Sequence, residues 1–373
     1  MYESKILNAI EAAIAGEEQA QPEPLVADKW LASSCLQKSV RRGEPERAIQ
    51  AATSLWEQDR RNFWHRVITI CVEDCGVASP DVIVKTLTAF NASAWRKRNN
   101  DLKIGLYLIR LMCEATKLRL ADEIFLIAAH ASEYQQHREA LAKQSNQALA
   151  DMVLDSKAPL LQRAIALWFL AGSKRYVADN MPVREGSLDM AAEVLRALKA
   201  PCDLMETCIA TLRKTPYPLA LFAPLLFEVV QGQTTCIKHN ALPAAPHVAN
   251  IPTYAMDVYT RGGQSCFRQL QKAVPEFKRF NIRQIGVAVF YIEGGLLDKF
   301  LTSPFLEELC QAGEAADAEG AGLSPDGYQQ LRSYLTQHMN LLNNIRQDEL
   351  RRYVNAIQGK PTITYYVSDG GTK

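Results

Sequence analysis

Apolar residues recur every three or four positions along most of the chain between Trp30 and about Leu154. Two sets with this spacing are Ile49, Ala52, Leu55 and Trp56, and Phe63, Val67, Ile70 and Val72. Because an α-helix completes a turn in about 3.6 residues, the spacing places these side chains on one helical face. Short polar breakers, RRGEP, QDRRN, CGVASPD and KRNND, separate the segments. The pattern predicts stacked antiparallel helices.

The same periodicity continues on both sides of this block. A short amphipathic helix is expected over residues 4–15, before an acidic, proline-bearing linker at 16–24. Ser79 is a candidate N-cap, and Pro80 follows at the first helical position, where its missing N–H costs nothing. Segments 156–175, 187–200 and 218–232 continue the pattern, and a long helix is expected from about Pro325 to Ile357.

The pattern changes between Gln231 and Ile251, where two prolines, two histidines and no helical stripe predict a loop or domain boundary. TITYYV (362–367) is the one convincing strand pattern, and a lone strand argues against a sheet. We therefore predict an all-α fold of stacked antiparallel helices in two helical subdomains, with at most a minor C-terminal strand. The expected parts are a helix and linker (1–28), a helical domain (29–155), its continuation (156–235) and a mostly helical C-terminal domain (236–373).

Composition narrows the expected partners and compartment. Lys and Arg number 42 against 41 Asp and Glu, so contact with nucleic acid must come from local clusters of charge. The nine Cys form no repeated pairing pattern, and the first residues do not resemble a secretory signal. No run approaches the roughly 18–20 apolar residues of a membrane helix. We expect a cytoplasmic protein with reduced thiols and no membrane contact.

One stretch resembles a known family. LQKSVRRGEPERAIQAATSLWEQ, followed by RVITICVEDCGVASPDVIVKTLTAF, is similar to the C-terminal helical region of the replication-associated recombination ATPases, the bacterial RarA/MgsA and eukaryotic Werner-interacting family. The matching elements are Leu36, Gln37, Lys38, Arg41, the helix Ala48 to Ala52, Arg66, Ile70, Glu73, Asp74, Gly76, Ala78 and Pro80. The resemblance covers residues 29–120, and EATKLR (114–119) stands where the family has a Pro-Lys-Ser-Asn-like stretch.

The resemblance implies the oligomerising, partner-binding part of a DNA-maintenance protein, separated from its motor. No G-x-x-x-x-G-K-[ST] loop occurs, and TRGGQSC and EGGLLDK lack the Lys-Ser/Thr pair that grips phosphate and Mg²⁺, so we expect neither ATPase activity nor a cofactor. A homo-oligomer, dimer or tetramer, is expected, with an ATPase or another DNA-maintenance protein and DNA as candidate partners. Large aromatic residues are the expected interface: Trp56, Phe63, Trp64, Phe90 and Trp95.

Several residue groups could carry chemistry. Adjacent helical side chains such as Glu73 and Asp74 point about 100° apart, which disfavours a shared metal. We expect one of these two carboxylates to cap the GVASP turn or to form an ion pair with Arg66 or Arg42. Cys71 and Cys75 lie four residues apart, a spacing that would also allow metal ligation, but we expect two small core residues because free Cys is usually buried. The set Cys236, His239 and His247, with Cys266 as a possible fourth ligand, has no standard zinc spacing, and no metal is assigned.

Two basic stretches and one turn are candidate nucleic-acid or anion contacts. An aromatic can stack on a base while Lys and Arg neutralise phosphates, and the alternative is a solvated charged face. The nucleic-acid candidates are Lys38, Arg41, Arg42, Trp95, Arg96, Lys97, Arg98 and Arg261. The candidate anion turn is Asp257, Thr260, Arg261, Gly262 and Gly263. Its alternative is an ordinary capped turn leading into a helix from Gln264 to Val274.

Two functions follow from these patterns. The first is a non-catalytic helical assembly or adaptor protein of DNA replication, repair or defence against mobile DNA. The alternative is a metal-dependent nuclease or other nucleic-acid-processing enzyme, assembled from Asp257, Glu293 and Asp298.

Overall fold

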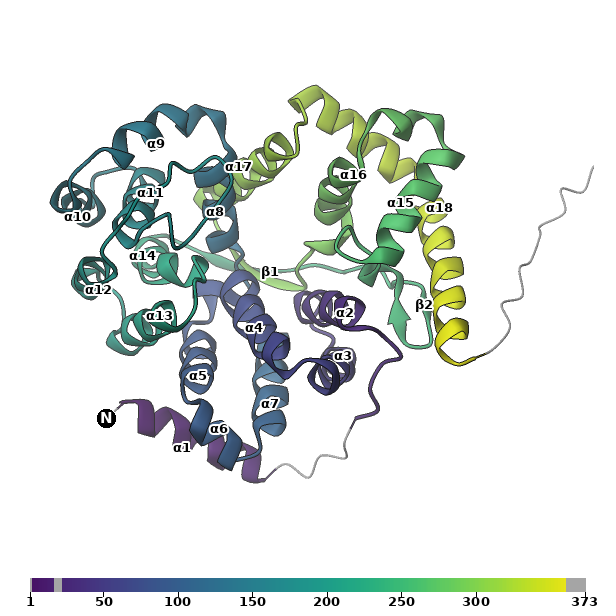
Figure 1. The fold of residues 1–373 in the computed structure, drawn as a ribbon, viewed down its shortest axis with the longest axis horizontal. Helices are drawn as coiled ribbons and strands as arrows, with labels where there is room; N and C mark the ends of the chain where they lie inside the picture. The colour runs from purple at the N-terminus through teal and green to yellow at the C-terminus, as the bar shows by residue number, and fades with distance from the viewer. Residues whose placement is uncertain (1, 17–21, 360–373) are drawn as a thin grey trace, which may run out of the picture.

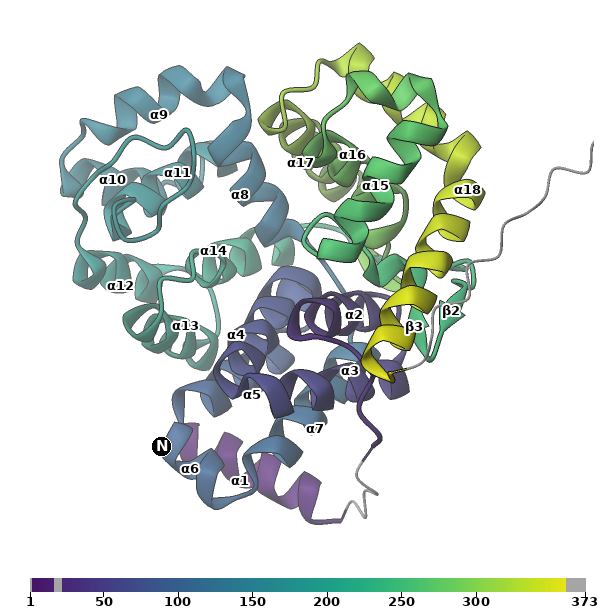
Figure 2. The same ribbon diagram turned by 45° about the vertical axis from the view of Figure 1, so that its right-hand side comes forward.

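The structure is a computed structural model that describes residues 2–16 and 22–359. It is 72% helical, with eighteen α-helices and two small antiparallel sheets of two strands each in this part of the chain. The predicted all-α class is confirmed. Three groups of helices surround a common centre, and Figure 2 shows the same grouping from a second direction (Figure 1).

The first group lies at the bottom of Figure 1 and includes the whole stretch in which the family resemblance is strongest. A side-chain cap begins its central helix, because Asp28 accepts hydrogen bonds from the backbone N–H groups of Trp30 and Leu31. The elements are α1 (Tyr2–Ala15), α2 (Lys29–Arg41), α3 (Pro45–Gln58), α4 (Arg60–Ile70), the π-helical turn η1 (Cys71–Cys75), the 3₁₀ turn η2 (Gly76–Ala78), α5 (Pro80–Asn91), α6 (Ser93–Arg98) and α7 (Asp101–Glu114).

The second group, at the upper left of Figure 1, is a set of shorter helices around the fully buried Trp168. Its elements are α8 (Leu120–His130), η3 (Ser132–Tyr134), α9 (Gln135–Ala142), α10 (Asn146–Leu154), α11 (Leu160–Ala171), α12 (Leu188–Ala197), α13 (Cys202–Lys214) and α14 (Leu219–Gln231).

The third group, at the upper right, carries the long C-terminal helix along its edge. Its elements are β1 (Cys236–His239), β2 (His247–Val248), β3 (Ile251–Pro252), η4 (Thr253–Ala255), α15 (Arg261–Ala273), η5 (Pro275–Arg279), α16 (Ile282–Val289), the π-helical turn η6 (Phe290–Gly294), β4 (Lys299–Thr302), α17 (Pro304–Gly320) and α18 (Pro325–Ile357). Helix α17 reaches back to pack along α8, which joins this group to the second.

Several predicted helices are confirmed, and the sheets are the main correction. The long helix α18 has the predicted ends, and α1, α11, α12 and α14 lie within or close to the predicted segments. The argument against a sheet was wrong, because β1 in the predicted loop pairs antiparallel with β4, and β2 with β3. The predicted strand TITYYV lies outside the described residues. Ser79 precedes α5 as predicted, but its hydroxyl donates to the carbonyl of Thr116 instead of capping the helix.

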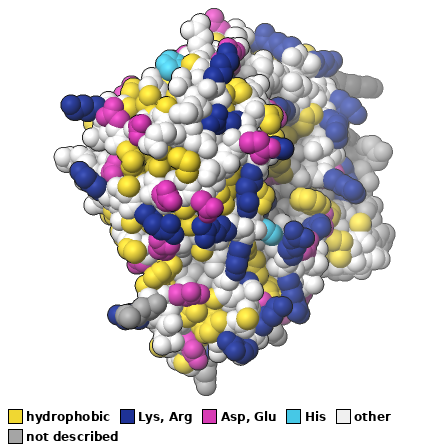
Figure 3. All heavy atoms as spheres, turned by 60° about the vertical axis from the view of Figure 1, so that its left-hand side comes forward, with side chains coloured by type: hydrophobic (Ala, Val, Ile, Leu, Met, Phe, Trp, Pro, Cys, Tyr) yellow, Lys and Arg dark blue, Asp and Glu magenta, His cyan; other side chains and the backbone are white. Residues whose placement is uncertain are grey.

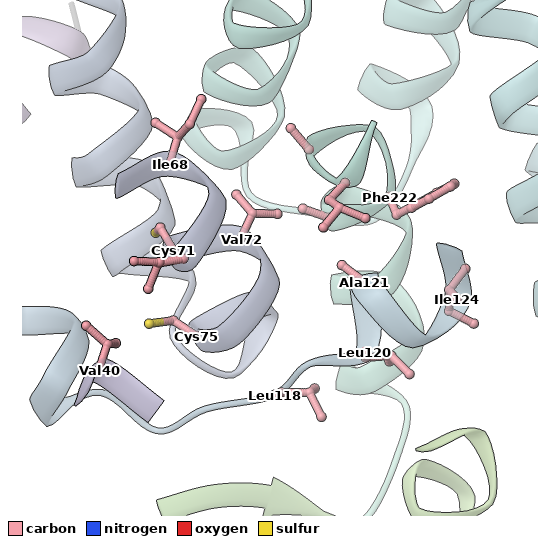
Figure 4. Close-up of a cluster of buried hydrophobic side chains, with 14 of the residues drawn as sticks. Val40, Ile68, Cys71, Val72, Cys75, Leu118, Leu120, Ala121, Ile124 and Phe222 are labelled. Carbon is pink, nitrogen blue, oxygen red and sulfur yellow. The ribbon is translucent and has the colours of Figure 1, made fainter. Parts of the chain in front are cut away.

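The first and second groups meet at an apolar core between α2, α4, η1, α8 and α14. Figure 4 shows Val40, Cys71, Cys75 and Leu118 close to this junction, with Phe222 entering from α14. Both cysteines are fully buried, which confirms the prediction that they are core residues. No helix in residues 2–16 and 22–359 combines the length and apolarity that a membrane crossing requires.

The predicted aromatic interface is largely interior. Trp56, Phe63 and Trp64 are buried and pack edge to face against one another, with ring centroids 5.3 and 5.5 Å apart. Phe90 and Trp95 are half-buried. The prediction that this set is an exposed interface was therefore wrong for the first three residues, which form the core of their own helical group.

Candidate functional site

The inward face of α2 carries polar side chains into the centre of the molecule. Gln37, Lys38 and Arg41 lie on this helix, and all three are buried. Positions three and four residues apart share a helical face, so Arg41 extends beside Gln37 and Lys38. The side chains of these residues contact the first and third helical groups, and we call the set of ion pairs and hydrogen bonds around them the central charge network.

Arg41 joins two π-helical turns that are far apart in the sequence. Its Nε donates to Asp74 Oδ1 at 2.6 Å and its Nη2 to Glu73 Oε1 at 2.8 Å, both on η1. Its Nη1 donates to the carbonyl of Gly294 on η6 at 2.9 Å. The guanidinium also lies 5.0 Å from the centre of the Phe290 ring. One buried cation thus holds the first group of helices against the third.

Gln37 also donates hydrogen bonds to both acidic residues. Its Nε2 donates to Glu73 Oε1 at 2.9 Å and to Asp74 Oδ2 at 3.0 Å, while its Oε1 accepts a bond from Arg66 at 2.9 Å. The prediction that one of the carboxylates pairs with Arg66 or Arg42 was therefore wrong. The expectation that the adjacent carboxylates diverge was wrong too, because Gln37 and Arg41 each bond to both of them.

Lys38 connects α2 to the start of the third group. Its ammonium pairs with Asp257 and donates to Ser34 Oγ at 2.6 Å, and Ser34 donates to the same carboxylate at 2.7 Å. Burial would raise the pKa of Asp257, but the charge of Lys38 and these hydrogen bonds hold it below its ordinary value. Asp257 is therefore an ionised partner of Lys38.

A second arginine, Arg119, links the first and second groups. It precedes α8 and pairs with Asp122 on that helix, and it lies 3.5 Å from Asp74 and 3.6 Å from Glu123. Its guanidinium is 4.5 Å from the centre of the Phe290 ring, so that ring contacts both Arg119 and Arg41. Asp74, whose side chain is fully buried, is shared by both arginines.

The third group contributes a further buried cation. Arg346, only 1% exposed, donates from α18 to Glu293 on η6 at 2.6 Å. Sequence reasoning missed Arg346, although it lies on the buried stripe of α18 between Leu342 and Leu350. A charged residue on an otherwise apolar helical face is a signal that could have identified it.

Carboxyl groups in the network titrate close to neutral pH. Burial and the neighbouring carboxylates Asp122 and Asp74 raise the pKa of Glu73 to about 7, against the opposing charges of Arg41 and Arg119. Burial likewise raises the pKa of Glu123 to about 8. Chemically, the network can hold the three groups together and take up protons near neutrality.

The structure places the predicted nucleic-acid residues in different environments. Lys38 and Arg41 belong to the network, and Arg42 is buried, pairs with Glu44 and donates to the carbonyl of Pro243. These cations are already neutralised, so they do not form the surface patch that was expected.

The second basic stretch is divided between interior and surface. Arg96 is buried, pairs with Asp101 and stacks over Trp64 at 3.7 Å from the ring centre. Lys97 and Arg98 are exposed at the end of α6. Trp95, two positions before Lys97 in the sequence, is half-buried.

The predicted anion turn is the capped start of α15. Thr260 accepts a hydrogen bond from the backbone N–H of Gly263 at 3.0 Å, as an N-cap does, and Arg261 is exposed. A Cβ on Gly263 would lie 1.9 Å from the carbonyl oxygen of Asp257, so close packing requires glycine there. Gly262 is part of the same first helical turn.

The carboxylates of the alternative nuclease site do not meet at one point. Asp257 pairs with Lys38, Glu293 with Arg346, and Asp298 with Lys117 at 2.7 Å, so each has its own cation. Cys236, His239 and His247 are exposed on β1 and β2, whereas Cys266 is buried in α15. In the described part of the chain no group of three or more His, Cys, Asp and Glu is arranged to hold a metal ion.

Comparisons with protein-family models, with curated proteins and with solved structures find no match to this chain.

Proposed function

We propose that this chain is a helical scaffold, which assembles with itself or with another protein in DNA replication, repair or defence against mobile DNA. The supporting observation is that the polar residues of the family resemblance are used in buried contacts between helices. Gln37 and Arg41 bond to Glu73 and Asp74, while Arg41 and Lys38 bond to the third helical group.

This use of polar side chains favours architecture over catalysis. A catalytic site presents donors, acceptors or nucleophiles to a substrate, whereas here the shared residues satisfy each other. Arg41 bonds through all three nitrogens to Asp74, Glu73 and the carbonyl of Gly294, and its side chain is only 4% exposed, so a ligand has no access to it. Residues of this kind specify how helices pack, and a defined shape is what an assembly module needs.

The surface used for assembly must lie outside the buried aromatic set. The long loop between α11 and α12 carries Val177 and Val183, which are 73% and 77% exposed, and Leu154 at the end of α10 is 43% exposed. A protein contact that covered these side chains would remove apolar area from water, which favours association. They are therefore the first positions to change in a test of assembly.

Light scattering over a wide range of protein concentration tests this proposal. A dimer or tetramer is expected for the wild type, and Val177→Asp with Val183→Asp should lower the mass if the loop is the contact. Ile237→Asp, at another exposed apolar position, is the matched control. A monomer at every concentration overturns self-assembly. Saturable ATP binding, or metal-dependent cleavage of single- or double-stranded DNA, would instead favour an enzyme.

A further inference from the structure

An exposed tryptophan at the start of α2 has no role in the central network. Trp30 is 54% exposed and borders a shallow hollow of about 220 Å³. The hollow is lined by Lys29, Trp30, Asp59, Arg61, Asn62 and His65. Because ligand pockets usually measure about 300–1,000 Å³, this hollow suits a single planar ring more than a larger molecule.

Cations outnumber acids around the hollow. Lys29 lies 3.2 Å from Asp59, and Asp59 also caps α4 by accepting a bond from the N–H of Asn62. Arg60 and Arg61 are exposed and form no ion pair with any residue of the described ranges 2–16 and 22–359. Arg61 lines the hollow, and its neighbour Arg60 lies over the Trp56 ring at 4.9 Å. Two arginines are thus open to an anionic partner.

A ring contact and a hydrogen bond link the hollow to the second basic stretch, Trp95 to Arg98. The ring of His65 lies 5.9 Å from that of Phe90, and the carbonyl of Phe90 accepts a bond from Arg96 at 3.5 Å. Exposed Lys97 and Arg98 follow directly on α6. Figure 3 views the molecule from a side on which Lys and Arg side chains gather in the lower right-hand part, around one histidine. This chain of contacts runs from the hollow to α6, and we call the exposed residues at its two ends, Trp30, Arg60, Arg61, Lys97 and Arg98, the Trp30 track.

We propose that the Trp30 track binds single-stranded nucleic acid. A base stacks on Trp30, while Arg60 and Arg61 contact the adjacent phosphates. Lys97 and Arg98 contact phosphates further along the strand. An exposed indole beside unpaired arginines is the combination that sequence-tolerant single-strand binding uses. The bases of a duplex are already stacked on each other, so a duplex cannot use the indole in this way. This binding would give the chain its contact with DNA in the proposed role, and its biological setting rests on that proposed function. Its chemistry rests only on the residues of the track.

Anisotropy of a labelled oligothymidylate tests the stacking step. Trp30→Ala should weaken binding about 5- to 100-fold, as expected for the loss of one base–aromatic stack, whereas Trp30→Phe should retain most of the affinity. Tyr259→Ala removes another highly exposed aromatic, 82% accessible, and should leave binding unchanged. Equal affinity of the wild type and Trp30→Ala overturns the proposal, as does binding of duplex more tightly than single strand.

Salt dependence and fluorescence test the remaining steps. Arg60→Ser with Arg61→Ser should lower the slope of log K against log salt by about 0.7 for each phosphate that is no longer neutralised, and Arg351→Ser should not change it. Trp56, Trp64 and Trp168 are buried and Trp95 is half-buried, so quenching by the oligonucleotide should fall strongly with Trp30→Phe, and any remaining quenching should come from Trp95. An unchanged slope or unchanged quenching contradicts the track. Light scattering of the same variants separates the two proposals: a lower mass with undiminished DNA binding makes Trp30 a protein contact and overturns the inference.

Discussion

Replacement of Arg41 by methionine tests whether the central charge network holds the helical groups together. The variant keeps an unbranched side chain in place but leaves Asp74 and Glu73, which lie 2.6 and 2.8 Å from the guanidinium, without their main cation. The Arg41 side chain is 4% exposed and that of Asp74 is fully buried, so water cannot replace it. Removal of one partner from a buried ion pair costs about 3–5 kcal/mol of unfolding free energy.

The expected change in melting temperature follows from the chain length. At about 2.1 cal/mol/K per residue, 373 residues give an unfolding entropy of roughly 0.8 kcal/mol/K, so the loss corresponds to a decrease of about 4–6 °C in Tm. A larger decrease in one of two separate transitions would indicate that one helical group detaches first. Scanning calorimetry distinguishes these patterns.

A surface arginine supplies the matched control. Arg351 lies 2.7 Å from Asp348, but both side chains are more than half exposed, at 58% and 59%. Arg351→Met should therefore cost at most about 0.5 kcal/mol. Adding Glu73→Gln to Arg41→Met should restore part of the lost stability, because it removes one uncompensated carboxylate. Equal Tm values for Arg41→Met and Arg351→Met would refute a stabilising role for the network.

Three further predictions concern protons, backbone and thiols. Because folding raises the pKa of Glu123 from 4.5 to about 8, the folded state holds a proton that the unfolded state has released, and Tm should fall between pH 6.5 and 8.5 in the wild type but less in Glu123→Gln. Gly76→Ala should destabilise by more than about 1–3 kcal/mol in urea unfolding, since Gly76 has φ +55° and an added Cβ would lie 2.1 Å from the carbonyl oxygen of Leu118. Iodoacetamide followed by peptide mass analysis should find Cys202 and Cys236 modified first in the native protein, because both are exposed.

Each of these three predictions has a control or a contradicting outcome. The pH range starts at 6.5 because burial lowers the pKa of His65 and His130, whose contribution has the opposite sign at lower pH. A pH slope that Glu123→Gln leaves unchanged would assign the titration elsewhere. Gly16→Ala, with open space around the added Cβ, should leave urea unfolding almost unchanged. Rapid modification of Cys113, whose thiol has a pKa raised by burial to about 12, would contradict its position in the core.

The sequence alone could predict most of the helical architecture. The ends of α18 agree with the predicted range because Pro325, the preceding Ser324 and an apolar stripe are local signals. Thr260 caps α15 for the same reason, since the bond joins residues only three apart. The candidate site could be predicted only in part: Lys38, Arg41, Glu73, Asp74 and Asp257 were singled out, but as separate motifs with other roles.

What only the tertiary structure decided is which of these groups meet. Lys38 and Asp257 are 219 positions apart, and no periodicity within one helix indicates such a pairing. The strands show the same limit, because Cys236 is paired with Thr302 and neither segment has a core-facing pattern of its own. Local sequence fixes helix ends and apolar faces through contacts within a few residues. The partner of a buried charge is instead set by the packing of whole helices, so a basic run that looks like a surface patch became part of the interior.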